Sequence, residues 1–293
     1  MTLLHLHCGI VAAAIACGPL LMAQPNPSEQ SKAAVLENQG RPMSVPVECT
    51  DDDIAWAGLS CTEQEPCPVY FELASVEPVG NKLFAAGNLH TEAVTLYSVL
   101  LGSPDEGKTW QEAYQRIRGA GLDRIDFIDM ANGWVSGQTL WPLAQDPFLL
   151  ATNDGGVTWR QQPVFEDGGP GSIQQFAFQS KDQGSLIVDR GEGSEEERYG
   201  LYETPNGGGT WHVKQLSSKP LRLAERAEKD WRVRTEAHAF QVERRRGAQW
   251  ISVAAFAVTA GYCKPSVRAV PVPSGEPGPA QPGRQPGNAR PQP

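Results

Sequence analysis

One eight-residue pattern occurs three times in this chain at a nearly constant spacing. It reads Ser/Thr-x-Asp/Asn-x-Gly-x-Thr-Trp and occupies residues 103–110, 152–159 and 204–211. Copies that start about 50 residues apart indicate repeated units of supersecondary structure, each packed against its neighbours. Unrelated glycine-rich turns would not keep this spacing. The repeat therefore limits the possible folds more than any other feature of the sequence.

The chemistry of the recurring positions predicts a hairpin turn. The Asp or Asn side chain can accept hydrogen bonds from backbone N–H groups of its own turn. The glycine can adopt a positive φ, the hydroxyls can bond across the turn, and the Trp covers apolar surface. We expect a structural role for Ser103, Asp105, Gly107, Thr109 and Trp110, for Thr152, Asp154, Gly156, Thr158 and Trp159, and for Thr204, Asn206, Gly208, Thr210 and Trp211.

A fourth, degenerate copy ends at Trp250. It keeps Gly247 three residues before the Trp, but Arg245 stands where the other copies have Asp or Asn. A guanidinium cannot accept the hydrogen bonds of the turn. We therefore expect the fourth hairpin to be closed differently, with the run Arg244–Arg246 at a solvated tip.

The chain between the copies repeats as well, as short apolar or alternating pieces typical of strands. These pieces are residues 69–73, 83–87 and 95–100, then 125–128, 133–137 and 148–151, then 176–178, 184–188 and 199–202, and finally 231–233 and 251–256. With the strand that each Trp opens, they give four short strands per period. Four-stranded units at this period predict an all-β fold, a small β-propeller of about four blades. A fifth unit around Trp56 is the alternative.

The pattern is the Asp-box, and the chain resembles the Asp-box or BNR-repeat propellers. The run 133–137, Gly-Trp-Val-Ser-Gly, followed by the copy at 152–159, looks most similar to the photosystem II stability/assembly factor-like family of exported bacterial proteins. The resemblance covers about residues 69–256 and implies a propeller. That family implies an arginine-rich patch for partner binding. This chain carries a formal net charge of -9 and shows no such patch in the matching units.

Asp-boxes also occur in sialidases, but the sialidase residues are missing here. That family has an Arg-Ile-Pro motif before its first box, whereas neither Arg116-Ile117 nor Arg124-Ile125 is followed by Pro. Asp105 and Asp154 lie in different repeats, so they should not converge as the carboxylates of a glycosidase do. The acidic runs 51–53 and 192–197 lack the spacing of a calcium loop and are expected to be solvated. We expect no catalytic residue, metal site or cofactor.

The N-terminus predicts an exported protein. Residues 10–16 form a short apolar core, and a cleavage point before Gln24 gives a signal peptide at 1–23. Cys17 could be lipidated in an alternative reading of this segment, which we disfavour because its lipobox lacks Leu. We then expect a flexible segment at 24–45, the propeller at 46–263 and a disordered Pro/Gly-rich tail at 264–293. No other segment is apolar enough to span a membrane.

Four cysteines follow the signal peptide: Cys49, Cys61, Cys67 and Cys263. An even number in an exported chain predicts two disulfides, while a four-thiolate zinc site is disfavoured because no CxxC pair is present. Four cysteines allow three pairings, which the sequence leaves open. We hypothesise that Cys263 pairs with one of the other three and helps to close the propeller, because a bridge over such a long loop stabilises the fold most.

These features favour an exported, non-catalytic scaffold, periplasmic or extracellular, that binds an unknown protein or glycan. A glycoside hydrolase or sialidase-like enzyme and a carbohydrate-binding module are the alternatives. Nucleic acid is disfavoured because the chain is acidic. Trp141 is a candidate ligand contact in an insertion between strands, although packing on its own blade is the favoured explanation.

Overall fold

The computed structural model describes residues 34–140, 143–191, 196–224 and 229–266. Several sequence-based expectations lie outside these residues. They are the signal peptide at 1–23 with Cys17, the first part of the segment 24–45, Trp141, residues 192–195 of the second acidic run, and the tail from residue 267.

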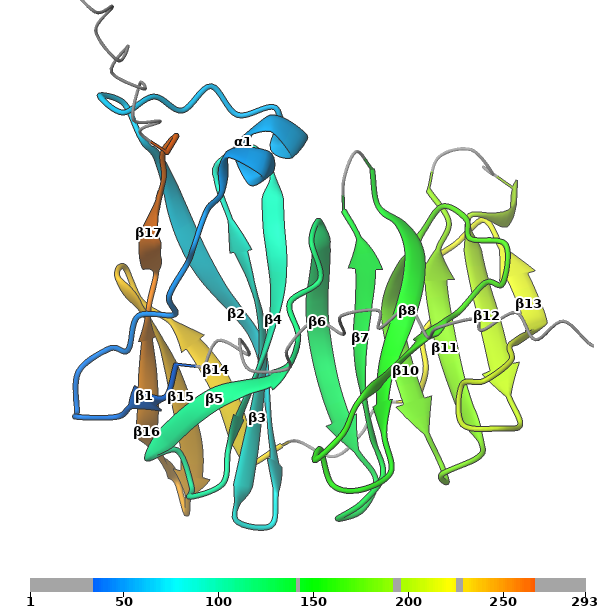
Figure 1. Ribbon diagram of the computed structural model, residues 1–293. Helices are drawn as coiled ribbons and strands as arrows, with labels where there is room; N and C mark the ends of the chain where they lie inside the picture. The colour runs from blue at the N-terminus through cyan, green and yellow to red at the C-terminus, as the bar shows by residue number, and fades with distance from the viewer. Residues whose placement is uncertain (1–33, 141–142, 192–195, 225–228, 267–293) are drawn as a thin grey trace, which may run out of the picture. The chain divides into compact units, whose positions relative to one another are not determined.

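The expected all-β fold is confirmed, with antiparallel strands in four sheets over the described residues (Figure 1). The first sheet contains β1 (Leu36–Glu37), β2 (Cys67–Val79), β3 (Lys82–His90), β4 (Thr95–Ser103), β5 (Thr109–Tyr114) and β17 (Thr259–Cys263). The second contains β6 (Ala120–Phe127), β7 (Gly133–Thr139), β8 (Gln145–Thr152) and β9 (Arg160–Pro163). The third contains β10 (Ser172–Phe178), β11 (Gly184–Asp189), β12 (Tyr199–Thr204) and β13 (His212–Ser217). The fourth contains β14 (Trp231–Thr235), β15 (Ala239–Arg246) and β16 (Gln249–Ala257).

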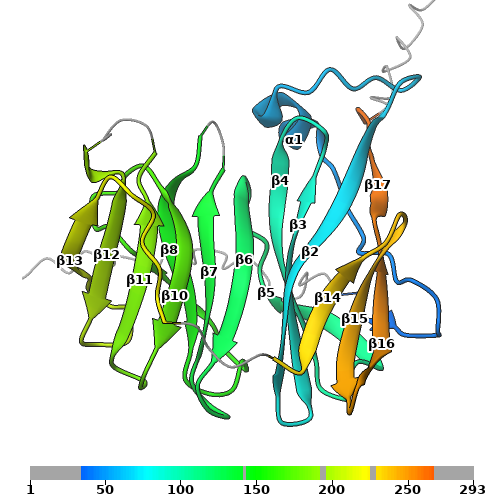
Figure 2. The ribbon, with the colours of Figure 1, turned by 180° about the vertical axis from the view of Figure 1, so that it is seen from behind.

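The sheets are the blades that the repeat predicts, and they contact one another in a fixed succession (Figures 1 and 2). Strands β14 and β15 of the fourth sheet contact β2 of the first. The first sheet contacts the second through β2, β3, β4 and β6, and the second contacts the third through β7, β8 and β10. The succession is therefore fourth, first, second, third, so the last sheet in the chain neighbours the first.

Within the described residues the fourth sheet has three strands where the repeat predicts four. Its place for a further strand is partly taken by the N-terminal segment, because Met43 forms a parallel bridge with Phe256 on β16. The chain that continues from β16 leaves the fourth sheet, and β17 pairs instead with β2 of the first sheet. The two ends of the propeller region are thus joined by backbone hydrogen bonds.

The core is divided among the contacts between neighbouring sheets. Phe71, Trp110 and Phe256 pack together where the first and fourth sheets meet. Phe84 and Trp159 belong to a second cluster between the first and second sheets. A third cluster lies between the second and third sheets. The apolar faces of the sheets therefore bury each other pairwise, which is how stacked repeats acquire a core.

The segment expected to be flexible contacts the sheets over its described part. Leu36 pairs with Trp110 in the register of β1 and β5. The Asn38 amide donates to the carbonyls of Gly107 and Val253, at 3.0 and 2.8 Å, and so links the first sheet to the fourth. Val45 is buried. Backbone pairing, an amide side chain and a buried apolar side chain provide these contacts, which the polar composition of the segment did not indicate.

The acidic run 51–53 is not a solvated loop, and that expectation was wrong for Asp53. Residues 51–57 form the helix α1 (Asp51–Ala57), and Asp53 is buried. Thr50 caps the helix, because its hydroxyl accepts from the Asp53 N–H while the Asp53 carboxylate accepts from the Thr50 N–H. The Tyr97 hydroxyl also donates to Asp53, at 2.5 Å, and Arg118 forms an ion pair with it.

Two disulfides join the four cysteines that the described residues contain. Cys49 pairs with Cys263, at a sequence separation of 214, and Cys61 pairs with Cys67. The hypothesis that Cys263 bonds one of the three upstream cysteines is confirmed, and disulfides replace the zinc alternative. Disulfides of this kind fit an oxidising compartment. Over the described residues, no helix is long and apolar enough to cross a membrane.

Candidate functional site

The first of the repeated hairpins is closed by a network of side-chain and backbone hydrogen bonds. The Gly107 N–H donates to the Ser103 hydroxyl oxygen at 2.8 Å, and that hydroxyl donates to Asp105 at 2.9 Å. Thr109 donates its N–H and its hydroxyl to the two Asp105 oxygens, both at 2.8 Å. The Trp110 indole N–H donates to the Gly107 carbonyl. Both carboxylate oxygens are therefore engaged within the turn.

The second and third hairpins repeat the bonds among the hydroxyls, the Asp or Asn and the backbone, but the indole N–H groups of Trp159 and Trp211 make no bond like that of Trp110. The Thr158 hydroxyl donates to Asp154 at 2.6 Å, as Thr109 does to Asp105. In the third hairpin the Asn206 amide nitrogen donates to the Thr210 hydroxyl at 3.1 Å, so this bond runs in the opposite direction. Asn206 thus keeps the turn without the charge.

The turn bonds also set the acidity of the two aspartates. Bonds from the Thr158 hydroxyl and N–H lower the pKa of Asp154 to about 2. The Thr109 N–H is the main cause that lowers the pKa of Asp105. A low pKa keeps each carboxylate ionised as an acceptor, which is the opposite of what a general acid needs.

The fourth hairpin is closed differently. Arg246 pairs directly with Gln249, so β15 and β16 are joined by the two residues Gly247 and Ala248. Gly247 has a φ of 61°. The positive φ of Gly247 allows a tight two-residue turn here. Arg245 occupies the position that Asp or Asn has in the other hairpins, and its Nε–H donates to the Gly247 carbonyl at 3.4 Å.

Each of the other hairpins rests on the sheet before it in the succession. The second hairpin lies on the first sheet, at a position that we call the first docking site, formed by Lys82 and Phe84. The Lys82 ammonium donates to the Gly155 carbonyl at 3.1 Å. A Cβ on Gly156 would overlap the Phe84 ring, so this ring lies directly on the hairpin backbone. Phe84 also packs edge-on against Trp159, with ring centroids 5.6 Å apart.

The third hairpin lies in the same way on the second sheet, at the second docking site, centred on Trp134. The Trp134 indole N–H donates to the Gly207 carbonyl at 3.1 Å. The first hairpin in turn lies against β16, since a Cβ on Gly107 would meet a Val253 methyl at 3.0 Å. In these three contacts a glycine backbone of the hairpin faces side chains of the preceding sheet.

Strand register identifies the equivalent position on the third sheet. Phe84 pairs with Gly102, the residue before Ser103. Trp134 pairs with Ala151, the residue before Thr152. By the same register, Ser185 pairs with Glu203, the residue before Thr204. Ser185 and Gln183 therefore occupy on the third sheet the positions of Phe84 and Lys82, and we call them the third docking site.

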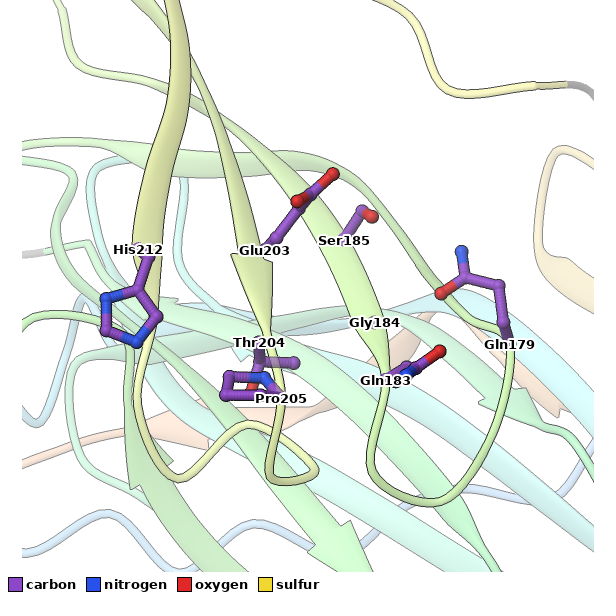
Figure 3. Close-up of a pocket in the computed structure, with 8 residues that line it drawn as sticks. All are labelled: Gln179, Gln183, Gly184, Ser185, Glu203, Thr204, Pro205 and His212. Atoms are coloured by element: carbon purple, nitrogen blue, oxygen red, sulfur yellow. The ribbon is translucent and has the colours of Figure 1, made fainter.

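The third docking site lies in a hollow of about 560 Å³ on the third sheet (Figure 3). Its residues come from the loop before β11, from β11 and β12, from the hairpin after β12 and from the start of β13. Figure 3 shows the hydroxyl, amide, carboxylate and imidazole groups around the hollow. The lining residues are Gln179, Gln183, Gly184, Ser185, Glu203, Thr204, Pro205 and His212. Where the first two docking sites have an aromatic ring, this one has a serine.

The sequence carries a signal for this site that the repeat alone does not reveal. The pieces 83–87, 133–137 and 184–188 were aligned as strands, and their second residues are Phe84, Trp134 and Ser185. The change from aromatic to serine marks the third unit as different. Its meaning depends on knowing that the second residue faces the neighbouring hairpin, which only the structure shows.

A second polar cluster lies between the sheets. The Lys229 ammonium contacts Glu77 on β2 at 2.5 Å and Asp126 on β6 at 3.7 Å. Burial raises the pKa of Glu77, and the charge of Lys229 partly offsets this. The cluster attaches the chain before β14 to the first two sheets. In the described part of the chain, no group of three or more His, Cys, Asp or Glu side chains could hold a metal ion.

No family model and no curated protein matches this chain. Among solved structures it is similar to YCF48 from Cyanidioschyzon merolae, at 15% identity and a TM-score of 0.35, over 62% of this chain and 59% of that one. It is also similar to the phage phi92 endosialidase, at 10% identity and a TM-score of 0.36, over 73% of this chain and 46% of that one. A third similar structure is the Penicillium chrysogenum alpha-L-arabinanase complexed with arabinobiose, at 14% identity and a TM-score of 0.35, over 77% of this chain and 71% of that one. The chain spans about three fifths of the first of these and just under half of the second. Likenesses at this level carry no argument about function.

Proposed function

We propose that the protein is an exported, non-catalytic propeller scaffold that binds a macromolecular partner at the third docking site. The observation that carries the proposal is the difference between equivalent positions. Phe84 and Trp134 are buried under hairpins of the next sheet, whereas at the equivalent places of the third site Ser185 is half-buried and Gln183 is exposed. A surface shaped to receive a hairpin is thus accessible to another molecule.

The chemistry of the hairpins supports a scaffold rather than an enzyme. The Asp105 and Asp154 carboxylates accept bonds from their own turns and belong to different sheets. These hydrogen bonds give the two carboxylates a structural role, which is to close the turn. Repeated units that each use the same residues for folding are typical of interaction propellers and other repeat proteins.

The lining of the third docking site favours a protein partner. At the first two docking sites, Lys82 and Trp134 each donate a hydrogen bond to a backbone carbonyl of the hairpin. Gln183 and Ser185 offer an amide and a hydroxyl donor at the equivalent places. A glycan is the second candidate ligand, because amide, hydroxyl and carboxylate groups also bond sugar hydroxyls.

Capture from the native cell envelope tests the proposal. The full chain is used as bait in three forms: wild type, Ser185→Arg, which fills the hollow, and Thr235→Arg, which adds the same charge at an exposed position of β14. We expect a stoichiometric partner with wild type and Thr235→Arg and its loss with Ser185→Arg. Equal capture by all three forms would exclude the third docking site, and a parallel sugar array identifies a glycan ligand.

Export is tested separately by the N-terminus of the protein isolated from its source. Cleavage of the signal peptide predicts a mature chain that begins at Gln24. The two disulfides support this part of the proposal, since they form in oxidising compartments. A mature protein that retains residues 1–23 in the cytoplasm would contradict it.

A further inference from the structure

The fourth hairpin differs from the other three in its surroundings. Arg246, Gly247 and Ala248 are exposed, and a Cβ on Gly247 would meet no atom within 4 Å. A Cβ on Gly156 would overlap a ring of the preceding sheet, and one on Gly207 would meet the Lys181 carbonyl at 2.6 Å. Among the described residues, the succession of sheets therefore has an exposed hairpin on its first member and an exposed docking site on its last.

Within one chain the fourth hairpin is held away from that docking site. The main contacts of β14 and β15 outside their own sheet are with β2. Strand β17, which follows β16 of the fourth sheet, pairs with β2 of the first sheet, and the Cys49–Cys263 disulfide ties β17 to the N-terminal segment. The third sheet contacts the second through β10. A hairpin for the third docking site is thus available from another molecule.

We propose that the third docking site receives the β15–β16 hairpin of a second copy of this chain. The proposal rests on the proposed function and names its partner. Gly247 and Ala248 are small, like the glycine pairs that lie on the first two docking sites. By equivalence with Lys82, the Gln183 amide donates to the Gly247 carbonyl of the second copy, and the Ser185 hydroxyl replaces the indole N–H of Trp134.

Charge supports the same occupant. The hairpin carries Arg246 at its exposed tip, and the docking site carries Glu203, whose side chain is 49% exposed. Glu203 already pairs with Lys214 at 3.1 Å. A second cation from the hairpin would share its carboxylate, which has acceptor positions for more than one donor. An arginine at a carboxylate forms the stronger, charge-assisted type of hydrogen bond.

A single contact joins different surfaces of the two copies, but two such contacts exchanged between the same two copies form a two-fold, isologous interface. Each copy can give one hairpin and receive one. The smallest assembly that satisfies both is a closed dimer, and failure to close would give longer oligomers.

Crosslinking between two singly substituted chains tests the proposal. Ser185→Cys and Ala248→Cys chains are purified separately, mixed and treated with a short bismaleimide, which leaves the native disulfides intact. We expect a crosslinked dimer only in the mixture. Gln39→Cys replaces Ala248→Cys in the control mixture, because Gln39 is exposed and lies outside the hairpin. No crosslink in the main mixture, together with a monomeric mass by light scattering at micromolar concentration, overturns the proposal.

A charge exchange gives an independent readout. Glu203→Arg should weaken self-association at least tenfold, and Arg246→Glu in the other copy should restore part of it. A chain with both Ser185→Cys and Ala248→Cys that crosslinks only within itself shows closure within one molecule and also overturns the proposal. If self-association fails while Ser185→Arg still abolishes capture of another partner, the proposed function stands and only the identity of the occupant is wrong.

Discussion

The indole of Trp134 lies parallel to the ring of Phe178, with an interplanar angle of 2° and ring centroids 3.6 Å apart. Trp134 belongs to β7 of the second sheet and Phe178 ends β10 of the third. The same indole donates its N–H to Gly207. One side chain thus joins two sheets by stacking and by a hydrogen bond to a hairpin, and the third sheet has Ser185 in its place.

Substitution of Trp134 separates the two contributions. Trp134→Phe removes the bond to Gly207 and should lower the free energy of unfolding by about 1 kcal/mol. Trp134→Ser also removes the buried ring and should cost about 3–5 kcal/mol. Urea unfolding measures both, and equal losses would mean that stacking contributes little.

Gly156→Ala should destabilise the fold strongly. Its φ is +77°, and the added methyl would overlap the Phe84 ring. Backbone strain and overpacking together should cost about 2–5 kcal/mol. Gly247→Ala is the matched control, because its φ is +61° with open space around it. The control should cost only about 1–2 kcal/mol. Thermal unfolding of both variants distinguishes strain from the contact between sheets.

The loss of stability on removing the Asp154 carboxylate should depend on whether the new side chain can still accept the hydrogen bonds of the turn. Asp154→Ala leaves the Thr158 N–H and hydroxyl without their acceptor and should cost about 1 kcal/mol. Asp154→Asn should cost less, because Asn206 closes the third hairpin with the same backbone bond. A larger loss for Asn than for Ala, measured by urea unfolding, would contradict this account.

The low pKa of Asp154 predicts a pH dependence. The pKa is about 2 in the folded chain and about 3.9 in an unfolded one. The folded state therefore binds the proton less tightly, and the carboxylate contributes stability above about pH 4 that is lost as the pH falls toward 2. Because the side chain is exposed, the effect should stay below about 1 kcal/mol. The difference in unfolding free energy between wild type and Asp154→Asn should shrink over this range, and a constant difference would argue against it.

The two disulfides should differ in their contributions. Loss of Cys49–Cys263, which encloses a separation of 214 residues, should cost up to about 5 kcal/mol by the chain-entropy model. Loss of Cys61–Cys67, with a separation of 6, should cost less. Paired Cys→Ala variants compared by denaturant unfolding measure this, and an equal loss from both would refute the loop-length argument.

The sequence indicated most of the fold because the repeat is local. Strand periodicity placed β3, β7 and β11, and the eight-residue pattern placed the hairpins that follow β4, β8 and β12. Helix α1 was missed, although Thr50 and Asp53 have capping-box spacing, because seven residues carry little periodicity. The pairing of β17 with β2 joins residues nearly 200 positions apart, and no local signal reports such a contact.

The docking sites could not be predicted in the same way. The aromatic residues Phe84 and Trp134 were visible in the sequence, but strand periodicity does not say which sheet a side chain faces. The succession of the sheets supplies this, and it follows from long-range contacts such as Lys229 with Glu77. Trp141, the candidate ligand contact, lies outside the described residues and stays a prediction.

The bond between Cys49 and Cys263 has a consequence for how the protein is made. The N-terminal segment packs on residues that are translated much later, since Met43 forms a bridge with Phe256 and the Asn38 amide donates to the Val253 carbonyl, 215 residues further along the chain. A nascent chain therefore exposes the apolar face of its first sheet until the fourth sheet has been synthesised. Maturation must wait for a contact of very high sequence separation, which makes folding slow and leaves the unfinished chain open to aggregation.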